Sequence, residues 1–248
     1  MKKTLLIAAV ALTTMATSCC SSENDGKGKC DSEKHDCKST SSCSSETKCK
    51  SKEKTTMAFQ KKYTNADFYK DGVFQEKVAE QAFREMFEFY GYEVTPFLEE
   101  NWWFVDFGLG DFENCGMGGV FWLNDPVSGY FAHDIYLLPG QMIPEHKHVE
   151  TEFPAKMESW MVRSGWCYNF SEVGDPTPDA PAIPESQAAT TISKKFIIQG
   201  TNGVTHLADA GKETYHFLMA GPEGAIVHEY ANYHDGAGLR FTNPKAKM

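Results

Sequence analysis

The sequence predicts an all-β barrel with one flanking N-terminal helix. After Pro96 the chain consists of short apolar runs separated by turn signals, which is the pattern of an all-β domain. In these turns Pro presets φ and Gly supplies a positive φ. They are Asn124-Asp125-Pro126, Pro139-Gly140 and Gly221-Pro222-Glu223-Gly224. Ahead of them, one stretch instead has its apolar residues at helical spacing.

The helical stretch runs from Asp71 to Tyr90. Its apolar residues recur every four positions and form a stripe along one face. They are Phe74, Val78, Ala82, Phe83, Met86, Phe87 and Tyr90. Asp71 is the expected N-cap, and Gly91 is the residue expected to end the helix in the left-handed conformation. We expect this helix to pack on the outer wall of the barrel or at a dimer interface, in a structural role.

The strands of the barrel follow from the apolar runs between the turns. The segment 172–187 carries four prolines and is expected to be a surface loop rather than a strand. The expected strands are 102–107, 118–123, 133–138, 142–148, 157–164, 166–171, 195–198, 204–208, 215–220 and 225–230.

Residues 1–18 have the features of a signal peptide. Lys2 and Lys3 precede an apolar segment, 5–12, that is too short to span a membrane. The small residues that follow end at Cys19, which resembles a bacterial lipoprotein signal, and ordinary secretory cleavage is the alternative. We therefore expect a protein of the bacterial cell envelope, lipid-anchored at Cys19 and facing the periplasm or the surface. No later segment has the roughly 18 apolar residues of a membrane helix, so the lipid would be the only anchor.

Residues 19–56 are predicted to form a disordered tether. Ser, Lys, Glu, Asp, Thr, Gly and Cys dominate this stretch, which lacks the large apolar residues needed to offset the entropy of ordering the chain. Its near-regular cysteines leave open soft-metal binding, a set of disulfides or haphazard pairing. The absence of a Cys-x2-Cys pair favours the last. These cysteines are Cys20, Cys30, Cys37, Cys43 and Cys49.

The folded part is expected to cover residues 57–248, a length that suits one domain with a sizeable core. Its two cysteines, Cys115 and Cys167, are expected to be buried thiols, with a disulfide between them as the alternative. The formal net charge of −10, without a basic cluster in this part, argues against a nucleic-acid partner.

The strongest functional signal is the pair His146 and His148, followed by Glu158. Side chains alternate along a strand, so histidines two positions apart lie on one face. Two imidazoles and a carboxylate from the next strand form a site for a first-row divalent metal. Glu150 and Glu152 are nearer in sequence but fall in the hairpin between the strands, so Glu158 is preferred.

The spacing Gly140-x5-His146-x-His148, then Glu158-x6-Gly165, resembles the first signature of the cupin superfamily. Cupins are small jelly-roll β-barrels with a metal in the mouth, so the resemblance implies a cupin barrel. They normally add a histidine fifty to sixty residues after the glutamate. His216 is preferred because 216 − 158 = 58. The alternatives are His228 and His206.

Three imidazoles and one carboxylate leave two positions open on an octahedral ion. Adjacent open positions suit the carbonyl and hydroxyl oxygens of an aldose or ketose, whose carbonyl the metal would polarise. A base must then carry a proton between the two carbons. Glu229, on a strand after His216, is the candidate base, and Lys156 is the candidate for stabilising the enediolate oxygen. A solvated strand glutamate and a loop lysine in water are the alternatives for these two residues.

Taken together, the motifs resemble the D-lyxose ketol-isomerase family of sugar-isomerising cupins over most of residues 103–244. The shared motifs are Val105-Asp-Phe-Gly-Leu-Gly110, Pro139-Gly-Gln-Met-Ile-Pro-Glu-His146-Lys-His148, Lys156-Met-Glu158, Tyr215-His-Phe217, Gly224-Ala-Ile-Val-His-Glu229 and Phe241-Thr-Asn-Pro244.

This resemblance implies interconversion of a free aldose and ketose, such as D-lyxose and its ketose, through an enediol. It implies a divalent metal, typically manganese rather than iron, zinc, nickel or cobalt, and a homodimer. The implied ligands are His146, His148, Glu158 and His216, with Glu229 near the bound sugar.

Two departures put the substrate in question. Similar enzymes often carry a lysine where this chain has His133-Asp134, and they are charged where residues 236–239 are uncharged. Two other functions remain open. One is a non-catalytic, metal-bearing cupin that binds carbohydrate at the cell surface. The other is an iron cupin dioxygenase.

Overall fold

The structure, a computed structural model, describes residues 58–206 and 213–248. The predicted signal peptide 1–18 with the anchor at Cys19, the predicted tether, and the end of the strand expected at 204–208 lie outside the described residues. Within the described ranges, no helix is long and apolar enough to cross a membrane.

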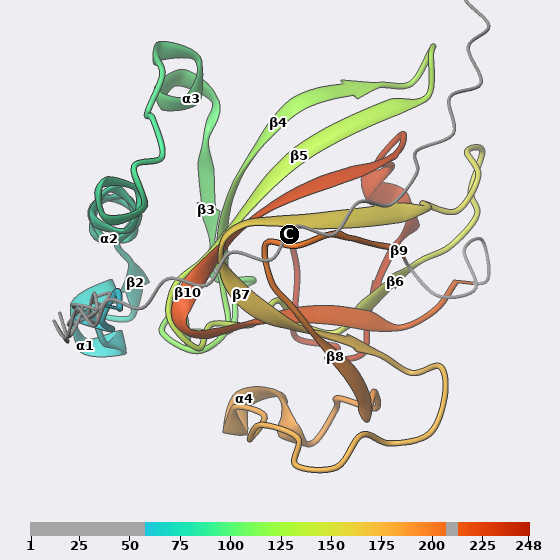
Figure 1. The fold of residues 1–248 in the computed structure, drawn as a ribbon. Helices are drawn as coiled ribbons and strands as arrows, with labels where there is room; N and C mark the ends of the chain where they lie inside the picture. The colour runs from blue at the N-terminus through green and yellow to red at the C-terminus, as the bar shows by residue number, and fades with distance from the viewer. Residues whose placement is uncertain (1–57, 207–212) are drawn as a thin grey trace, which may run out of the picture. The chain divides into compact units, whose positions relative to one another are not determined.

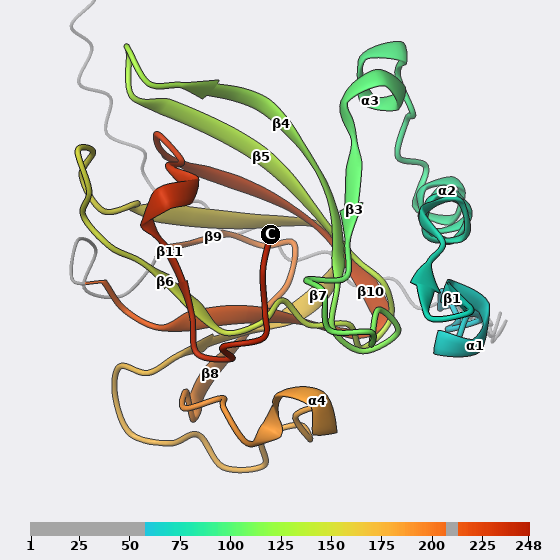
Figure 2. The same ribbon diagram turned by 180° about the vertical axis from the view of Figure 1, so that it is seen from behind.

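One curled, antiparallel sheet forms the barrel, which confirms the predicted all-β fold class (Figures 1 and 2). Its edge-to-edge order is β11-β6-β10-β5-β4-β3, and β7 pairs with β10, β8 and β9. The strands within the described part of the chain are β3 Trp103–Val105, β4 Met117–Asp125, β5 Tyr130–Leu137, β6 His146–His148, β7 Glu158–Ser171, β8 Lys195–Gln199, β9 Val204–His206, β10 His216–Asn232 and β11 Leu239–Phe241.

The two longest strands, β7 and β10, run antiparallel to each other along almost their whole length. The sequence predicted two strands in place of β7 and two in place of β10, the latter separated by a turn at 221–224. Both predictions were wrong, because each is a single strand. Both strands bend without breaking, because Gly165 and Gly224 adopt positive φ angles of 66° and 75°. The two glycines are so close that a Cβ on Gly165 would lie 2.0 Å from the Gly224 carbonyl oxygen. Glycine therefore lets the paired strands turn together and close the barrel.

The flanking helix, α2 (Glu76–Tyr90), begins later than the predicted start at Asp71. Asp71 and Gly72 form the two-residue turn of a hairpin between β1 (Tyr69–Lys70) and β2 (Val73–Phe74), with φ angles of 52° and 76°. Asp-Gly is a favoured sequence for such turns. The predicted end at Gly91, in the left-handed conformation, is confirmed.

Alternating side chains of β5 divide the apolar core into an outer and an inner part. Tyr136 points outward, and Phe83 and Phe87 of α2 pack against it in a cluster between helix and sheet. Ile135 and Leu137 point inward, into a second cluster inside the barrel. The helix therefore covers the outer wall, as predicted, and leaves the barrel interior to a separate set of residues.

The remaining helical segments are short and lie outside the sheet (Figure 1). One of them, α4, lies at the end of the proline-rich segment 172–187 that the sequence predicted as a loop. They are α1 Asn65–Phe68, α3 Pro96–Asn101, α4 Glu185–Ala188 and the 3₁₀ turn η1 Gly236–Gly238. Cys115 and Cys167 are free and buried, as predicted, and burial raises the pKa of the Cys167 thiol to about 12.

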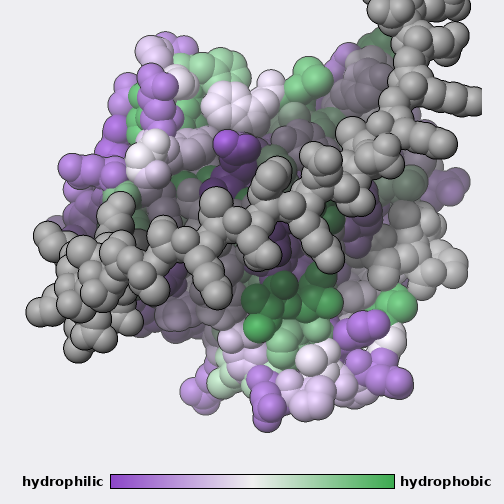
Figure 3. Space-filling view, viewed as in Figure 1, coloured by the Kyte–Doolittle hydropathy of each residue, from purple (hydrophilic) through white to green (hydrophobic). Residues whose placement is uncertain are grey.

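An apolar patch lies on the outer surface over β8 and β9. Figure 3 shows hydrophobic surface gathered where β8 runs, and β8 and β9 carry the exposed apolar side chains Ile197, Ile198 and Val204. This patch is on the outside of the barrel and does not line the cavity described next.

Candidate metal centre

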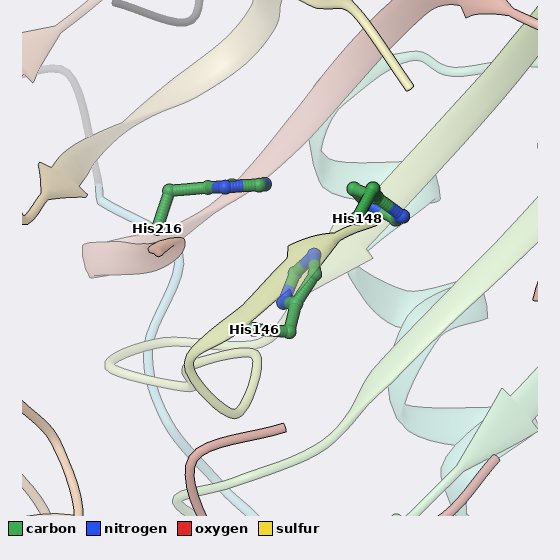
Figure 4. Close-up of side chains that lie close together, drawn as sticks. All are labelled: His146, His148 and His216. Atoms are coloured by element: carbon green, nitrogen blue, oxygen red, sulfur yellow. The ribbon is translucent and has the colours of Figure 1, made fainter. Parts of the chain in front are cut away.

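Three histidines converge inside the barrel. His146 and His148 come from the same face of β6, and His216 is the first residue of β10, the strand paired with β6 at this point. One ring nitrogen of each lies within 4.8 Å of the others. Figure 4 shows the three imidazoles extending from these two strands into a common space.

The carboxylate of Glu158, at the start of β7, completes this cluster. Its Oε2 lies 2.8 Å from His216 Nε2, and its Oε1 lies 3.2 Å from His148 Nε2. Glu158, His148 and His216 are all buried. The structure thus brings together the four residues predicted as ligands.

The hydrogen bonds of the histidines determine which nitrogens face the cluster. His146 Nδ1 lies 2.9 Å from the Pro144 carbonyl, and His216 Nδ1 lies 2.8 Å from the Thr214 carbonyl. A carbonyl oxygen only accepts, so Nδ1 carries the hydrogen and Nε2 keeps its lone pair. Such backbone bonds fix the tautomer of metal-binding histidines.

The inward-facing atoms fit a divalent metal. Within the described residues, His148 Nε2, His216 Nε2 and Glu158 Oε2 are buried and have no well-formed hydrogen bond. The neutral imidazole presents a lone pair to an ionised carboxylate, so the atoms approach as two acceptors. A shared cation resolves that contact, and nitrogen and oxygen donors of this kind suit first-row divalent ions.

Charge also favours this arrangement. Burial acts to raise the pKa of Glu158, but Lys156 and the two histidines outweigh it and hold the pKa well below its ordinary value. Burial lowers the pKa of His146 well below its ordinary value, with further lowering from the other imidazoles. His148 shifts in the same direction, again chiefly through burial. An ionised carboxylate and neutral imidazoles are the forms that bind metals.

His216 behaves differently from its two neighbours. Burial acts to lower its pKa, but the facing Glu158 carboxylate outweighs burial and raises it.

Glu229 and Lys156 lie beside the cluster. Both are buried, so neither is the solvated glutamate or the lysine in water that remained open from the sequence. Lys156 Nζ contacts Glu229 Oε1 and lies 2.9 Å from Glu158 Oε1. Burial acts to lower the pKa of Lys156, but the two carboxylates outweigh it and raise the pKa, so the ammonium is retained. One buried cation therefore bridges the predicted ligand Glu158 and the predicted base.

The rival residues lie elsewhere. His228 contacts the buried Asp134 through Nδ1 on the opposite face of the sheet. His206 is exposed and its Nδ1 lies 2.6 Å from the Ser159 hydroxyl. Glu150 and Glu152 are exposed in the segment between β6 and β7. None of these four side chains lines the cavity at the cluster.

The cavity beside the cluster has a volume of about 60 Å³, room for a few water molecules. Trp103, Phe121 and Phe131 form an aromatic wall of this cavity. Lys156 Nζ lies 4.3 Å from the centre of the Phe131 ring. The cavity therefore combines an apolar wall with a few placed polar groups, as small-molecule sites do.

The sequence did not assign roles to two histidines on this wall. His133 Nδ1 lies 3.2 Å from Glu229 Oε2, and His234 stacks on Phe131 with ring centres 5.4 Å apart. Alternation along β5 could have indicated His133, because it shares the inward face with Ile135. His234 follows β10 in a loop and carries no such signal.

The chain is similar to two sugar isomerases. It is 33% identical to the D-lyxose/D-mannose isomerase of Thermosediminibacter oceani over 155 residues, which cover 62% of this chain and 83% of that protein. It is 33% identical to the D-lyxose ketol-isomerase of Cohnella laeviribosi over 166 residues, which cover 66% of this chain and 87% of that protein. No family model matches the chain.

Solved structures show a likeness of fold. An L-ribose isomerase of Acinetobacter sp. DL28 aligns with a TM-score of 0.52 at 16% sequence identity, over 67% of this chain and 90% of that one. That of Cellulomonas parahominis aligns with the same TM-score and identity over 68% and 92%. This likeness confirms the expected β-barrel fold.

Proposed function

Because this chain belongs to the D-lyxose ketol-isomerase family and is an aldose–ketose isomerase, we propose that its substrate is D-lyxose and that it requires a divalent metal. The metal would be held by His146, His148, Glu158 and His216, with manganese as the favoured ion. The chemistry would interconvert D-lyxose and D-xylulose through an enediol.

One observation carries this proposal. Acceptor atoms of two histidines and Glu158 meet without a hydrogen bond among them in the described structure, directly beside a buried Glu229 and Lys156. The two histidines and Glu158 suit a cation, and Glu229 with Lys156 suits proton transfer. The cavity that they share is where a small sugar would have to react.

The metal, when bound, supplies a Lewis acid that polarises the sugar carbonyl. The side chains divide the remaining work. Glu229 removes the proton from C2 of the aldose, the C–H electron pair forms the C1=C2 bond, and the carbonyl oxygen gains negative charge. Lys156 stabilises that charge with its ammonium group. Glu229 then returns the proton to C1, and the C2 hydroxyl proton moves to O1, which leaves the ketose.

The positions of the acid–base groups agree with these roles. Lys156 holds one oxygen of the Glu229 carboxylate and His133 lies at the other, so the carboxylate has a fixed orientation. Trp103, Phe121 and Phe131 limit access of water to the enediol. A dry site strengthens the electrostatic effect of the lysine.

The test is a D-lyxose to D-xylulose conversion assay, with metal content measured on the same protein. We expect bound divalent metal, loss of turnover after chelation, and recovery with manganese. A series with iron, zinc, nickel and cobalt decides the preferred ion. Full turnover by thoroughly chelated protein would exclude the metal requirement. Metal binding without turnover of D-lyxose, but with turnover of another aldose, would reject the substrate and keep the isomerase.

Two further properties are proposed on the sequence alone. The lipoprotein-like signal supports anchoring at Cys19, which metabolic labelling with a fatty acid tests: Cys19→Ala should abolish labelling. The family resemblance supports a homodimer, which light scattering during size-exclusion chromatography tests. A monomeric mass would reject it.

A further inference from the structure

His234 stands where the inner cavity meets an outer hollow. The inner cavity, of about 60 Å³, contains the candidate ligands, and a wider hollow of about 430 Å³ lies next to it. Residues that line both define a neck between them. They are Phe121, His234, Leu239, Phe241 and Met248. Among these described residues, His234 alone has a polar side chain.

The backbone of His234 is held on both sides by one residue. Its N–H donates to Asn124 Oδ1, and its carbonyl accepts from Asn124 Nδ2, both at 3.0 Å. Asn124 belongs to β4, so the loop after β10 is tied to the barrel. The imidazole is fixed as well, stacked on Phe131 at an interplanar angle of 26°. A residue positioned in this way is preorganised rather than mobile.

The ring presents a buried nitrogen that lacks a partner. His234 Nδ1 has no hydrogen bond within the described part of the chain. A buried polar atom left without a partner is destabilising, because it has lost its hydrogen bonds to water and gained none in return. His133 Nε2 is also unpartnered, but it lies against the β4 backbone, only 2.5 Å from where a Cβ on Gly119 would be. His234 Nδ1 is therefore the better placed of the two for a ligand.

A pentose that reacts in the inner cavity has further carbons besides the two that react, and the neck is where they can extend toward the outer hollow. Each of these further carbons carries a hydroxyl, and an apolar neck would strip water from a hydroxyl without replacing its hydrogen bond. We propose that His234 is a specificity-determining residue whose imidazole binds one sugar hydroxyl other than the two that react. This inference rests on the proposed function, because it assumes that the reacting carbons lie beside Glu229.

Two variants separate the hydrogen bond from the packing. His234→Phe keeps an aromatic ring on Phe131 and removes the polar nitrogens. His234→Asn places an amide close to the position of Nδ1. We expect the Phe variant to lower kcat/KM for D-lyxose at least tenfold, mainly through KM, and the Asn variant to recover part of that loss.

Sugars that lack one hydroxyl identify the contact. Wild-type protein and His234→Phe are compared on D-lyxose analogues deoxygenated at C3, C4 or C5. For one analogue, kcat/KM should be nearly the same in the two proteins, because the missing hydroxyl is the one that His234 binds. The inference would be overturned if His234→Phe lowered kcat/KM by the same factor on all three analogues, or if it did not lower kcat/KM for D-lyxose.

Binding of a pentitol keeps this test independent of turnover. Calorimetry with D-arabinitol, a non-reacting polyol, should show weaker binding by His234→Phe than by wild type or His234→Asn. If the wild-type protein isomerises no sugar, the proposed function fails, and the pentitol measurement alone decides on His234. Metal content should be unchanged in both variants. A variant that loses metal would show that His234 acts by supporting His148, and would overturn the inference.

Discussion

Glu229 and His133 face each other across two adjacent strands, with Oε2 3.2 Å from Nδ1. The next pair along these strands, His228 and Asp134, makes the corresponding contact on the opposite face of the sheet. Glu229 cannot shift along β10 without disturbing both pairs. The proposed base is therefore held by the register of the sheet as well as by Lys156.

Glu229→Gln should abolish most turnover while sugar binding persists. Glutamine has nearly the same shape but cannot accept a proton at neutral pH, so the transfer between the two carbons loses its base. We expect kcat to fall by roughly 10²- to 10⁴-fold, with little change in pentitol binding by calorimetry. Glu223→Gln, on the same strand but away from the cavity, is the control and should retain full activity. Full activity in the Glu229 variant would assign the base elsewhere.

His216→Ala should remove metal from the protein. His216 Nε2 points into the cluster and lies 2.8 Å from Glu158 Oε2, so its loss deletes one of four expected ligands. Mass spectrometry of dialysed protein should show a large loss of metal relative to wild type. His206→Ala, at an exposed histidine of β9, should leave the metal content unchanged. The reverse result would move the ligand to His206, one of the two alternatives that the sequence left open.

The sequence was informative where chemistry depends on local spacing. His146 and His148 lie on one face because strand side chains alternate, and this holds whatever surrounds the strand. Cavity residues contributed by distant segments could not be foreseen in the same way. His234 reaches the neck because Asn124, on another strand, ties down its loop. Such a contact is a product of tertiary packing and has no sequence pattern.

The errors in the fold have a similar origin. Gly221-Pro222-Glu223-Gly224 has the composition of a turn, yet it lies within β10 as a bulge, and the pairing with β7 is made on either side of it, at Ala220 and Ala225. The helix start was placed too early because Phe74 fits the apolar stripe of α2. Phe74 instead belongs to β2 and packs against Phe112. Apolar spacing alone cannot distinguish these two uses of one side chain.

The metal-free protein should lose stability as the pH falls below 6.5. Burial lowers the pKa of His234 to about 3, with smaller lowering from Lys156 and His148, and burial also lowers the pKa of His133. An unfolded imidazole binds a proton near pH 6.5, whereas these folded ones remain neutral to lower pH. The unfolded state therefore binds more protons in this window, so the free energy of unfolding rises with pH. The stabilising effect is complete above pH 6.5 and is lost as the pH falls toward about 3 for His234.

Urea denaturation of chelated protein between roughly pH 5 and 7 measures this dependence, because most carboxylates stay ionised there. The free energy of unfolding should change less over this pH range in His234→Phe than in wild type. His206→Ala serves as the control because His206 is exposed. Identical pH dependence in wild type and His234→Phe would mean that His234 is protonated alike in the folded and unfolded states.

Gly165→Ala should be among the most destabilising single-methyl additions in the barrel. The residue has a φ of 66°, and the new Cβ would lie 2.0 Å from the Gly224 carbonyl oxygen, a backbone atom that cannot rotate away. We expect a loss of about 3 kcal/mol or more in the free energy of unfolding, from the left-handed conformation and the overlap together. Gly129→Ala, in the β4–β5 turn, is matched for conformation, with a φ of 74° and nothing within 4 Å of the added Cβ. It should cost only about 1–2 kcal/mol. The difference between the two urea midpoints isolates the close approach of β7 and β10, and equal costs would show that their bend is not held by glycine contact.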